Sequence, residues 1–304
     1  MTAGTPGPSV TLSDGDLPPL FRESDQRAVV HQGEAFRAVR VQLVVLLLAT
    51  AAAMLAERLD SHIPAALAAG LYALTVVIGV RTSRRRARVH WVTDRAVAEL
   101  LKSLAWMYMV HGGPFHSRVL HPDDRFEEQL EERLRELRKV GWEDVRDGPY
   151  VRGAAQITPA MRAVRAKPFE VRRDIYLRDR VMEQHAWYKR RAAQAHRAST
   201  HWSAMTAALT LLALVAAVLR ATGVISGWDL TGLLSTAAAA GVAWQEMRRH
   251  RPLTYAHSLI EQELETLRIA MGTTVTEERW ADSVAEAERL VSPQHSDWLG
   301  RFGG

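Results

Sequence analysis

Three histidines in the middle of the chain are the first residues to consider for chemistry. His111, His116 and His121 lie in a segment that contains glycine and proline, and Asp123 and Asp124 follow directly. Imidazole and carboxylate groups are common ligands of zinc and other transition metals. The spacing of these residues matches no standard metal site. We therefore expect no metal at these histidines.

The sequence offers little else for catalysis. It contains no cysteine, and it lacks the glycine-rich phosphate loops, the HExxH zinc motif and the GxSxG nucleophile elbow. Many acidic residues belong to ladders of charged side chains spaced four residues apart, such as Glu127, Glu131, Arg135 and Lys139. In such a ladder, opposite charges four residues apart stabilise a solvated helix face. We therefore expect a protein that is not an enzyme and that carries no cofactor.

Small and hydroxyl-bearing residues stand out because they interrupt long uncharged stretches. Residues 41–56, 63–80, 202–219 and 230–245 contain no Asp, Glu, Lys, Arg or His, whereas ion-coupled transporters normally carry at least one such group in a span. Two roles remain open for the small and hydroxyl-bearing residues, close helix packing or the lining of a polar conduit. The candidate pore-lining or packing residues are Thr206, Thr210, Gly232, Ser235, Thr236, Ala239 and Ala243.

The elements that position these residues are predicted to be transmembrane helices. A helix rises about 1.5 Å per residue, so that about 17–25 residues cross a bilayer. With their flanking residues, the uncharged stretches predict four spans, at about 38–58, 62–81, 202–221 and 228–246. The expected fold is an all-α integral membrane protein with two parallel-repeated transmembrane helical hairpins and cytoplasmic amphipathic helices.

Basic residues are distributed unevenly about these spans. Seventeen arginines and lysines lie before the first and third spans or after the second and fourth, against only Arg58 and Arg220 in the two short connections. This asymmetry predicts that both termini and the central region lie in the cytoplasm and that the chain sits in the inner (plasma) membrane. The net charge of +5 then favours the lipid bilayer over nucleic acid as a partner, because the basic residues crowd beside the spans.

The rest of the chain divides into a tail, two domains and a linker. We predict a disordered tail at 1–24, a first two-span domain at 25–150, a linker at 151–168 and a second two-span domain at 169–304. Apolar residues at helical spacing predict amphipathic helices outside the spans, with two stripes at Val97, Leu100, Leu101, Leu104 and Met107 and at Phe126, Leu130, Leu134 and Leu137.

Aromatic and polar residues on the long helical stretch before the third span are candidates for coupling. A helix joined to a span can transmit a tilt that a bound partner induces, provided that the partner favours one state. The candidate coupling residues are Tyr176, Gln184, Trp187 and Tyr188.

Short motifs in both halves resemble one known family. In the first half these are Trp91, AELLK at 98–102, AWMY at 105–108 and GPF at 113–115. In the second half they are DIYLR at 174–178, Gln184, WYK at 187–189, Ala192, Tyr255, EL at 263–264, EAE at 286–288 and Trp298. Each half is similar to a different variant of the bacterial SLATT family, whose members are SMODS- and SLOG-associating effectors with two transmembrane helices.

The resemblance implies a function without catalytic residues. Such proteins are proposed to form pores in bacterial defence systems that nucleotide second messengers drive, and we expect this chain to form a homo-oligomer. We expect no nucleotide-making or nucleotide-sensing domain to be fused to this chain, so that the trigger is either a separate protein of that kind or absent. A membrane-anchored interaction or adaptor protein without conductance, or a constitutive small-ion channel, remains an alternative.

Overall fold

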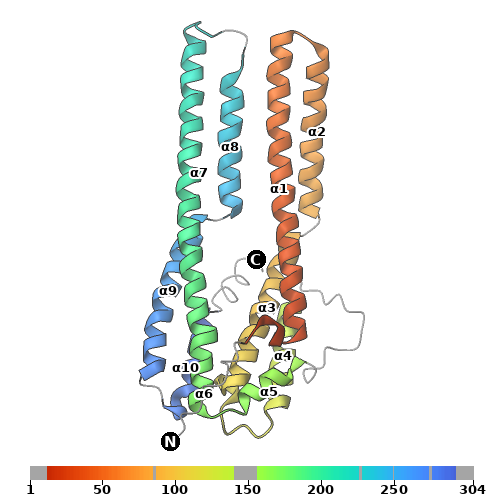
Figure 1. Cartoon of the computed structure of the whole chain (residues 1–304). Helices are drawn as coiled ribbons and strands as arrows, with labels where there is room; N and C mark the ends of the chain where they lie inside the picture. The colour runs from red at the N-terminus through yellow and green to blue at the C-terminus, as the bar shows by residue number, and fades with distance from the viewer. Residues whose placement is uncertain are drawn as a thin grey trace, which may run out of the picture. The chain divides into compact units, whose positions relative to one another are not determined.

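The structure, a computed structural model, describes residues 12–84, 87–139, 156–225, 228–248, 250–273 and 276–291. Every regular element within these residues is a helix, which confirms the predicted all-α fold (Figure 1). The chain divides into two compact units. We call residues 31–88 and 190–257 the hairpin unit, and residues 1–30, 89–189 and 258–304 the core unit.

Four long helices make up most of the hairpin unit. They are α1 (Pro19–Leu59), α2 (His62–Arg84), α7 (Glu183–Ala221) and α8 (Leu230–Arg248), and α9 (His250–Thr273) begins in this unit. Their outward faces carry large apolar side chains, such as Val76, which is 65% exposed, and Leu211, which is 62% exposed. Lipid rather than water is the solvent that such surfaces fit.

Length and composition identify three membrane-spanning candidates among the described residues. They are Pro19–Leu59, His62–Ser83 and Phe169–Ala221, in agreement with the predicted first three spans. The fourth predicted span, α8, is not among them, because alanine, glycine, serine and threonine make up much of its length and are only weakly apolar. The chain is a membrane protein, and the four-span count stays a prediction.

Small residues set the distance between α7 and α8. Gly241 of α8 is buried, and a Cβ atom added to it would lie only 2.6 Å from Cγ2 of Thr206 on α7. Ser203 of α7 also donates a hydrogen bond of 3.4 Å to Gln245 of α8. The two helices therefore approach as closely as a glycine permits.

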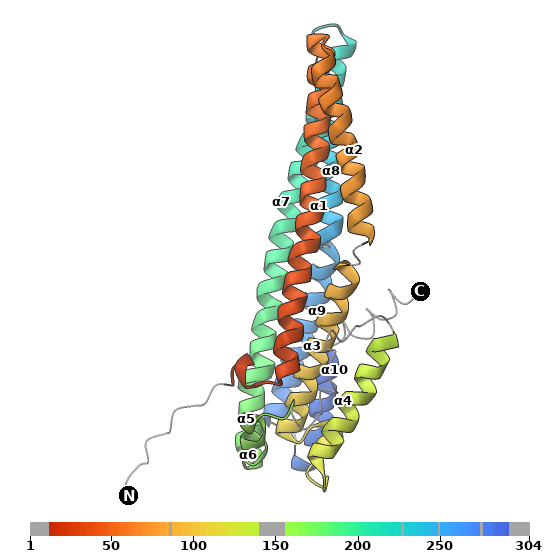
Figure 2. The same ribbon diagram turned by 90° about the vertical axis from the view of Figure 1, so that its right-hand side faces the viewer.

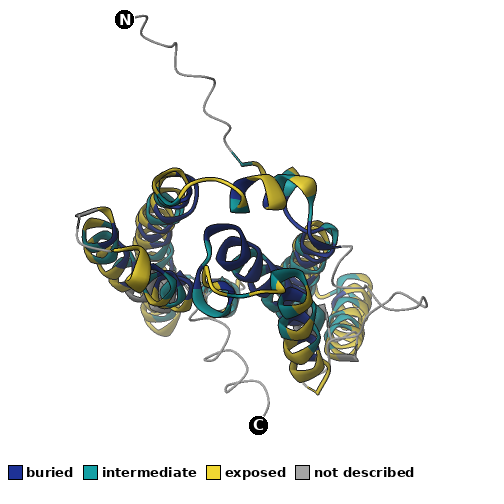
Figure 3. Ribbon diagram, turned by 90° about the horizontal axis from the view of Figure 1, so that it is seen from below, coloured by how far each residue is buried: buried dark blue, intermediate teal, exposed yellow. Residues whose placement is uncertain are grey.

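The core unit contains the remaining helices, and its main apolar cluster joins residues from distant parts of the chain. Its elements include η1 (Asp14–Asp16), α3 (Ala87–Val110), η2 (Gly113–Phe115), α4 (Pro122–Lys139), α5 (Pro159–Arg165), α6 (Phe169–Tyr176), the π-helical segment Leu177–Met182 and α10 (Glu277–Val291). Both predicted apolar stripes, on α3 and on α4, are buried. Figure 3 shows buried residues facing the middle of this group of helices.

A glycine at the end of α3 allows α10 to pack closely against it. The Gly112 N–H donates to the Met107 carbonyl at 2.8 Å, and a Cβ atom on Gly112 would lie 2.2 Å from Cγ1 of Val284 on α10. The next residue, Gly113, has a φ of +49°, a conformation that glycine adopts without steric cost. The glycine pair therefore both ends α3 and permits the close packing of α10.

Residues 12–24 differ from the predicted disordered tail. α1 begins at Pro19, and Leu17, Leu20 and Phe21 are at most 4% exposed. The Leu20 N–H donates to Oε1 of Gln156 at 2.9 Å. Three apolar side chains among the prolines are sufficient to attach this segment to the core, and only residues 1–11 of the predicted tail lie outside the described part of the chain.

The predicted linker at 151–168 also differs from the structure over its second part. Thr158 caps α5 by accepting a hydrogen bond of 3.2 Å from the Met161 N–H, and Met161 and Val164 are buried in the core. Apolar residues at helical spacing within a proline-containing stretch explain this short helix. Residues 151–155 lie outside the described part.

Candidate functional site

The threonines predicted to line a pore use their hydroxyl groups within their own helices. On α7, the Thr206 hydroxyl donates to the Trp202 carbonyl and the Thr210 hydroxyl to the Thr206 carbonyl, both at 2.9 Å. On α8, the Thr236 hydroxyl donates to the Gly232 carbonyl at 2.8 Å. Hydroxyl groups satisfied in this way are tolerated in a lipid environment and still offer lone pairs to water.

Packing divides the predicted small residues of α8 into two groups. Gly241 and Gln245 contact α7 and Ala238 is buried, whereas Ser235, Ala239 and Ala243 are exposed. Gly232 lies at the helix start, where its N–H donates to Oδ1 of Asp229 at 3.0 Å. The exposed stripe Ser235, Ala239 and Ala243 is therefore available to lipid or to a second copy of the chain.

Both arginines in the short connections have partners in the hairpin unit. Arg220 forms ion pairs with Glu57 at 3.2 Å and with Asp229 at 3.1 Å, and thereby joins the ends of α1 and α7. The guanidinium group of Arg58 lies 5.9 Å from the centre of the Trp228 ring. The positive charge at this end is thus compensated locally.

In the core unit, a fully buried ion pair joins α10 to the segment that precedes α7. Arg180 donates from Nε to Oε1 of Glu288 at 3.0 Å and from Nη2 to Oε2 at 2.7 Å. The Tyr176 hydroxyl donates to the same Oε1 at 2.9 Å, and all three side chains are at most 2% exposed. Arg180 lies in the π-helical segment Leu177–Met182, a rare geometry that is frequent at functional sites.

Electrostatics hold Arg180 and Tyr176 of this network in one protonation state each. Burial disfavours a charged guanidinium, but the adjacent Glu288 carboxylate outweighs it and raises the pKa of Arg180 further. Burial and the Glu288 charge also raise the pKa of Tyr176 well above its usual value. Arg180 therefore stays charged and Tyr176 stays neutral over the physiological range. The remaining guanidinium nitrogen of Arg180, Nη1, has no hydrogen-bond partner within the described part of the chain.

The other three predicted coupling residues line one cavity of about 220 Å³ in the core unit. Gln184, Trp187 and Tyr188 form one side of it. The rings of Trp187 and Tyr188 are in edge-to-face contact, with their centres 5.0 Å apart. The Tyr188 hydroxyl donates a hydrogen bond of 3.1 Å to the Val291 carbonyl of α10. Tyr188 also packs with Ile260 and Leu264 of α9. The beginning of α7 is thus attached to both helices that follow the hairpin unit.

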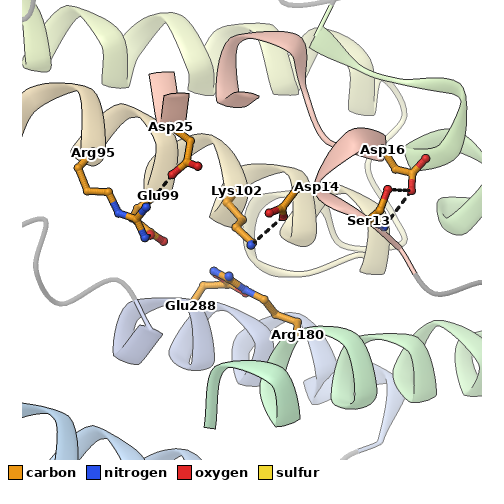
Figure 4. Close-up of polar contacts among 9 residues, drawn as sticks. All are labelled: Ser13, Asp14, Asp16, Asp25, Arg95, Glu99, Lys102, Arg180 and Glu288. Carbon is orange, nitrogen blue, oxygen red and sulfur yellow. Dashed lines mark hydrogen bonds and ion pairs between the residues drawn. The ribbon is translucent and has the colours of Figure 1, made fainter. Parts of the chain in front are cut away.

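Charged side chains also line this cavity, and Figure 4 shows the contacts among them. Arg95 of α3 bonds Asp25 of α1 at 2.6 Å and also contacts Glu99, and Lys102 bonds Asp14 at 3.0 Å. These pairs connect α1 and the preceding η1 to α3, and Arg180 and Glu288 connect α10 to the segment that precedes α7. Both long helices therefore begin at fixed positions in the core unit.

Sequence reasoning missed the charged members of this site. Glu288 adjoins the apolar positions Val284, Ala287 and Val291 on α10, and it is buried with them. Arg180 follows Tyr176 by one helical turn. The sequence signal that could have identified them is a charged residue beside an apolar stripe. Such a residue is rarely buried unless it has an oppositely charged partner.

The three histidines lie apart from this site. His111 ends α3 with a φ of +60°, and its pKa falls to about 4 because of burial and the nearby Arg165 and Arg172. His116 and His121 are exposed. Within the described residues, no three His, Asp or Glu side chains form a group that could hold a metal ion.

These observations describe a helical membrane protein. Two of its long helices, α1 and α7, begin in the core unit, whose helices are joined by ion pairs and hydrogen bonds. Two family models match the chain. SLATT_3, the SMODS and SLOG-associating 2TM effector domain 3, matches residues 18–173, and SLATT_1, the SMODS and SLOG-associating 2TM effector domain 1, matches residues 176–298. The chain belongs to the SLATT family and carries two such domains in tandem. No curated protein and no solved structure matches it.

Proposed function

We propose that this protein is a homo-oligomeric, pore-forming effector of the inner (plasma) membrane in a bacterial defence system. Its spans form the permeation path, its core unit controls opening, and it catalyses no reaction. The family supports the effector role, since each matched domain is described as a two-transmembrane effector domain. Lipid and further copies of the chain are its constitutive partners in this proposal.

The same description, which applies to each of the two matched domains, supports a four-span arrangement. The weakly apolar α8 supplies the fourth span, because its contact with α7 through Gly241 and Thr206 buries part of its polar backbone and side chains. The arginine distribution supports an orientation with the core unit and both termini in the cytoplasm.

The observation that carries the gating proposal is the continuity of two helices. α1 begins in the core unit and runs without a break to Leu59, and α7 runs from Glu183 to Ala221 in the same manner (Figures 1 and 2). A helix that continues from the core unit into a span offers a covalent route by which a rearrangement at the Arg180–Glu288 pair or at Trp187 can reach that span.

The trigger in this proposal is a separate nucleotide-generating or nucleotide-sensing protein, or the nucleotide that it supplies. Such a trigger opens the pore only if it binds the open arrangement more tightly than the closed one. The core unit offers the surfaces on which that difference arises, because it holds the first turns of α1 and α7.

Dye leakage from liposomes that contain the purified protein, with and without candidate cyclic nucleotides, tests conduction. In cells, we expect overexpression to slow growth and to collapse the membrane potential, as measured by dye fluorescence. Trp187→Ala should alter this response at an unchanged level in the membrane fraction. Thr236→Val removes one hydroxyl group and should change conductance more than assembly. Leu120→Ala, at an 88% exposed position of the core unit, is the matched control.

An intact potential and sealed liposomes under every candidate trigger would contradict the pore. The better account would then be a membrane-anchored interaction or adaptor protein without conductance. Leakage that neither a trigger nor Trp187→Ala changes would instead identify a constitutive small-ion channel.

A further inference from the structure

Two helices of the hairpin unit each present an aromatic ring and an arginine one turn apart, and these four side chains stack on one another. Phe36 and Arg40 come from α1, and Trp244 and Arg248 come from α8. The Arg248 guanidinium carbon lies 4.3 Å from the centre of the Phe36 ring and 5.0 Å from that of Trp244. Arg40 lies 5.6 Å from the Trp244 ring, and the two rings are 6.2 Å apart.

No carboxylate among the described residues balances the charge of this cluster. Among the described residues, neither Arg40 nor Arg248 forms an ion pair with an acidic side chain. Burial lowers the pKa of Arg248, and the nearby Arg40 and Arg191 lower it further. Like charges held in proximity without a counter-ion repel one another, and a bound anion relieves this repulsion.

The cluster lies where the uncharged surface ends on both helices. Arg40 directly precedes the uncharged stretch 41–56 on α1, and Trp244 and Arg248 lie at the end of α8, after its apolar part. Tryptophan and arginine at the end of a span occupy the headgroup level of a bilayer. The anion most abundant at that level is the phosphate of an anionic lipid.

We propose that Arg40 and Arg248 form a binding site for the phosphate group of an anionic glycerophospholipid, with Phe36 and Trp244 holding the two guanidinium groups in place. A planar guanidinium donates two parallel hydrogen bonds to phosphate oxygens, and stacking on aromatic rings leaves its edge free to do so. The site joins α1 of the first domain to α8 of the second. It requires α8 to lie in the bilayer, but it does not require the protein to conduct.

Native mass spectrometry of the full-length protein in detergent tests this proposal by counting retained phosphatidylglycerol and phosphatidylcholine. We expect the wild-type protein to prefer phosphatidylglycerol and the double variant Arg40→Gln/Arg248→Gln to bind it about tenfold or more weakly, since each arginine near an anionic lipid contributes about 1 kcal/mol. Arg40→Gln alone changes an exposed side chain and should show part of the loss. Arg37→Gln/Arg197→Gln removes the same charge at two exposed positions and is the matched control.

An equal loss in the two double variants would overturn the proposal, because it would reflect net charge alone. So would displacement of phosphatidylglycerol by an equal concentration of inorganic phosphate or glycerol 3-phosphate, which would identify a site for soluble phosphates. Tryptophan fluorescence and size-exclusion profiles establish that each variant is folded. Persistent binding with an absence of dye leakage would leave the lipid site intact and count only against the pore.

Discussion

At the scale of single residues, burial separates the charged pairs that matter for stability from those that do not. Pairs such as Arg125 with Glu128 are exposed on α4, and pairs of this kind contribute little because water screens them. Arg180 and Glu288 are at most 2% exposed and make two hydrogen bonds with each other. Removing one partner leaves an uncompensated charge in the apolar core.

Glu288→Gln should therefore destabilise the protein by about 3–5 kcal/mol, since the Arg180 charge would stay buried without its counter-charge. The double variant Arg180→Met/Glu288→Leu should be closer to the wild type, because it removes both charges at similar volume. Thermal unfolding of the full-length protein in detergent, followed by tryptophan fluorescence, measures both. A Glu288→Gln melting point equal to that of the wild type would show that the pair is not buried as described.

At the scale of elements, α8 has two faces of small residues with different surroundings. Gly241 contacts Thr206 of α7 so closely that it leaves no room for a side chain. Ala239 and Ala243 are exposed on another face of the same helix. The first face determines how the α7–α8 pair packs, and the second is available for contacts outside the chain.

The two faces should respond differently to the same change. Gly241→Leu should separate α7 from α8 and lower the melting point of the protein in detergent, because the leucine overlaps Thr206. Ala239→Leu should leave the melting point of the monomer unchanged and reduce the homo-oligomer population, which chemical cross-linking and size-exclusion chromatography measure. An oligomer population equal to that of the wild type would assign the Ala239 face to lipid.

At the scale of the whole molecule, the distribution of basic residues predicts the orientation of the helices in the membrane. The α1–α2 turn contains Asp60 with a φ of +45°, and the α7–α8 connection contains Asp229, which is paired with Arg220. The exposed Leu120 belongs to the core unit. A membrane with the two connections on one side and the core unit on the other satisfies the positive-inside rule.

Single cysteines test this topology cleanly, because the chain contains none. An impermeant thiol reagent applied to intact cells should label Ser61→Cys and Gly227→Cys, while Leu120→Cys and Phe302→Cys should react only after permeabilisation. Ser61 is chosen beside Asp60 because it avoids a substitution at a positive φ. Labelling of position 120 from outside the cell would show that the orientation is opposite to the predicted one.

The linear pattern of the sequence was enough to predict the membrane class, the first three spans and the buried stripes of α3 and α4. These properties are local, since a continuous apolar run or a helical period determines which solvent each face prefers. The family motifs are equally local. Trp187 and Tyr188 could be selected because aromatic residues before a span stand out in a charged stretch.

Only the tertiary structure shows which charged and small residues are buried. Helical spacing cannot show that Arg180 meets Glu288, because these residues lie 108 positions apart and their burial requires that α10 pack against the start of α7. Leu17, Leu20 and Phe21 stand among prolines, and they join a core cluster that also contains Ile157, Met161 and Val164, while Gln156 accepts a hydrogen bond from the Leu20 N–H. The face of α8 that packs is determined in the same way, by the position of Thr206 on its neighbour and not by any difference among the alanines of α8 themselves.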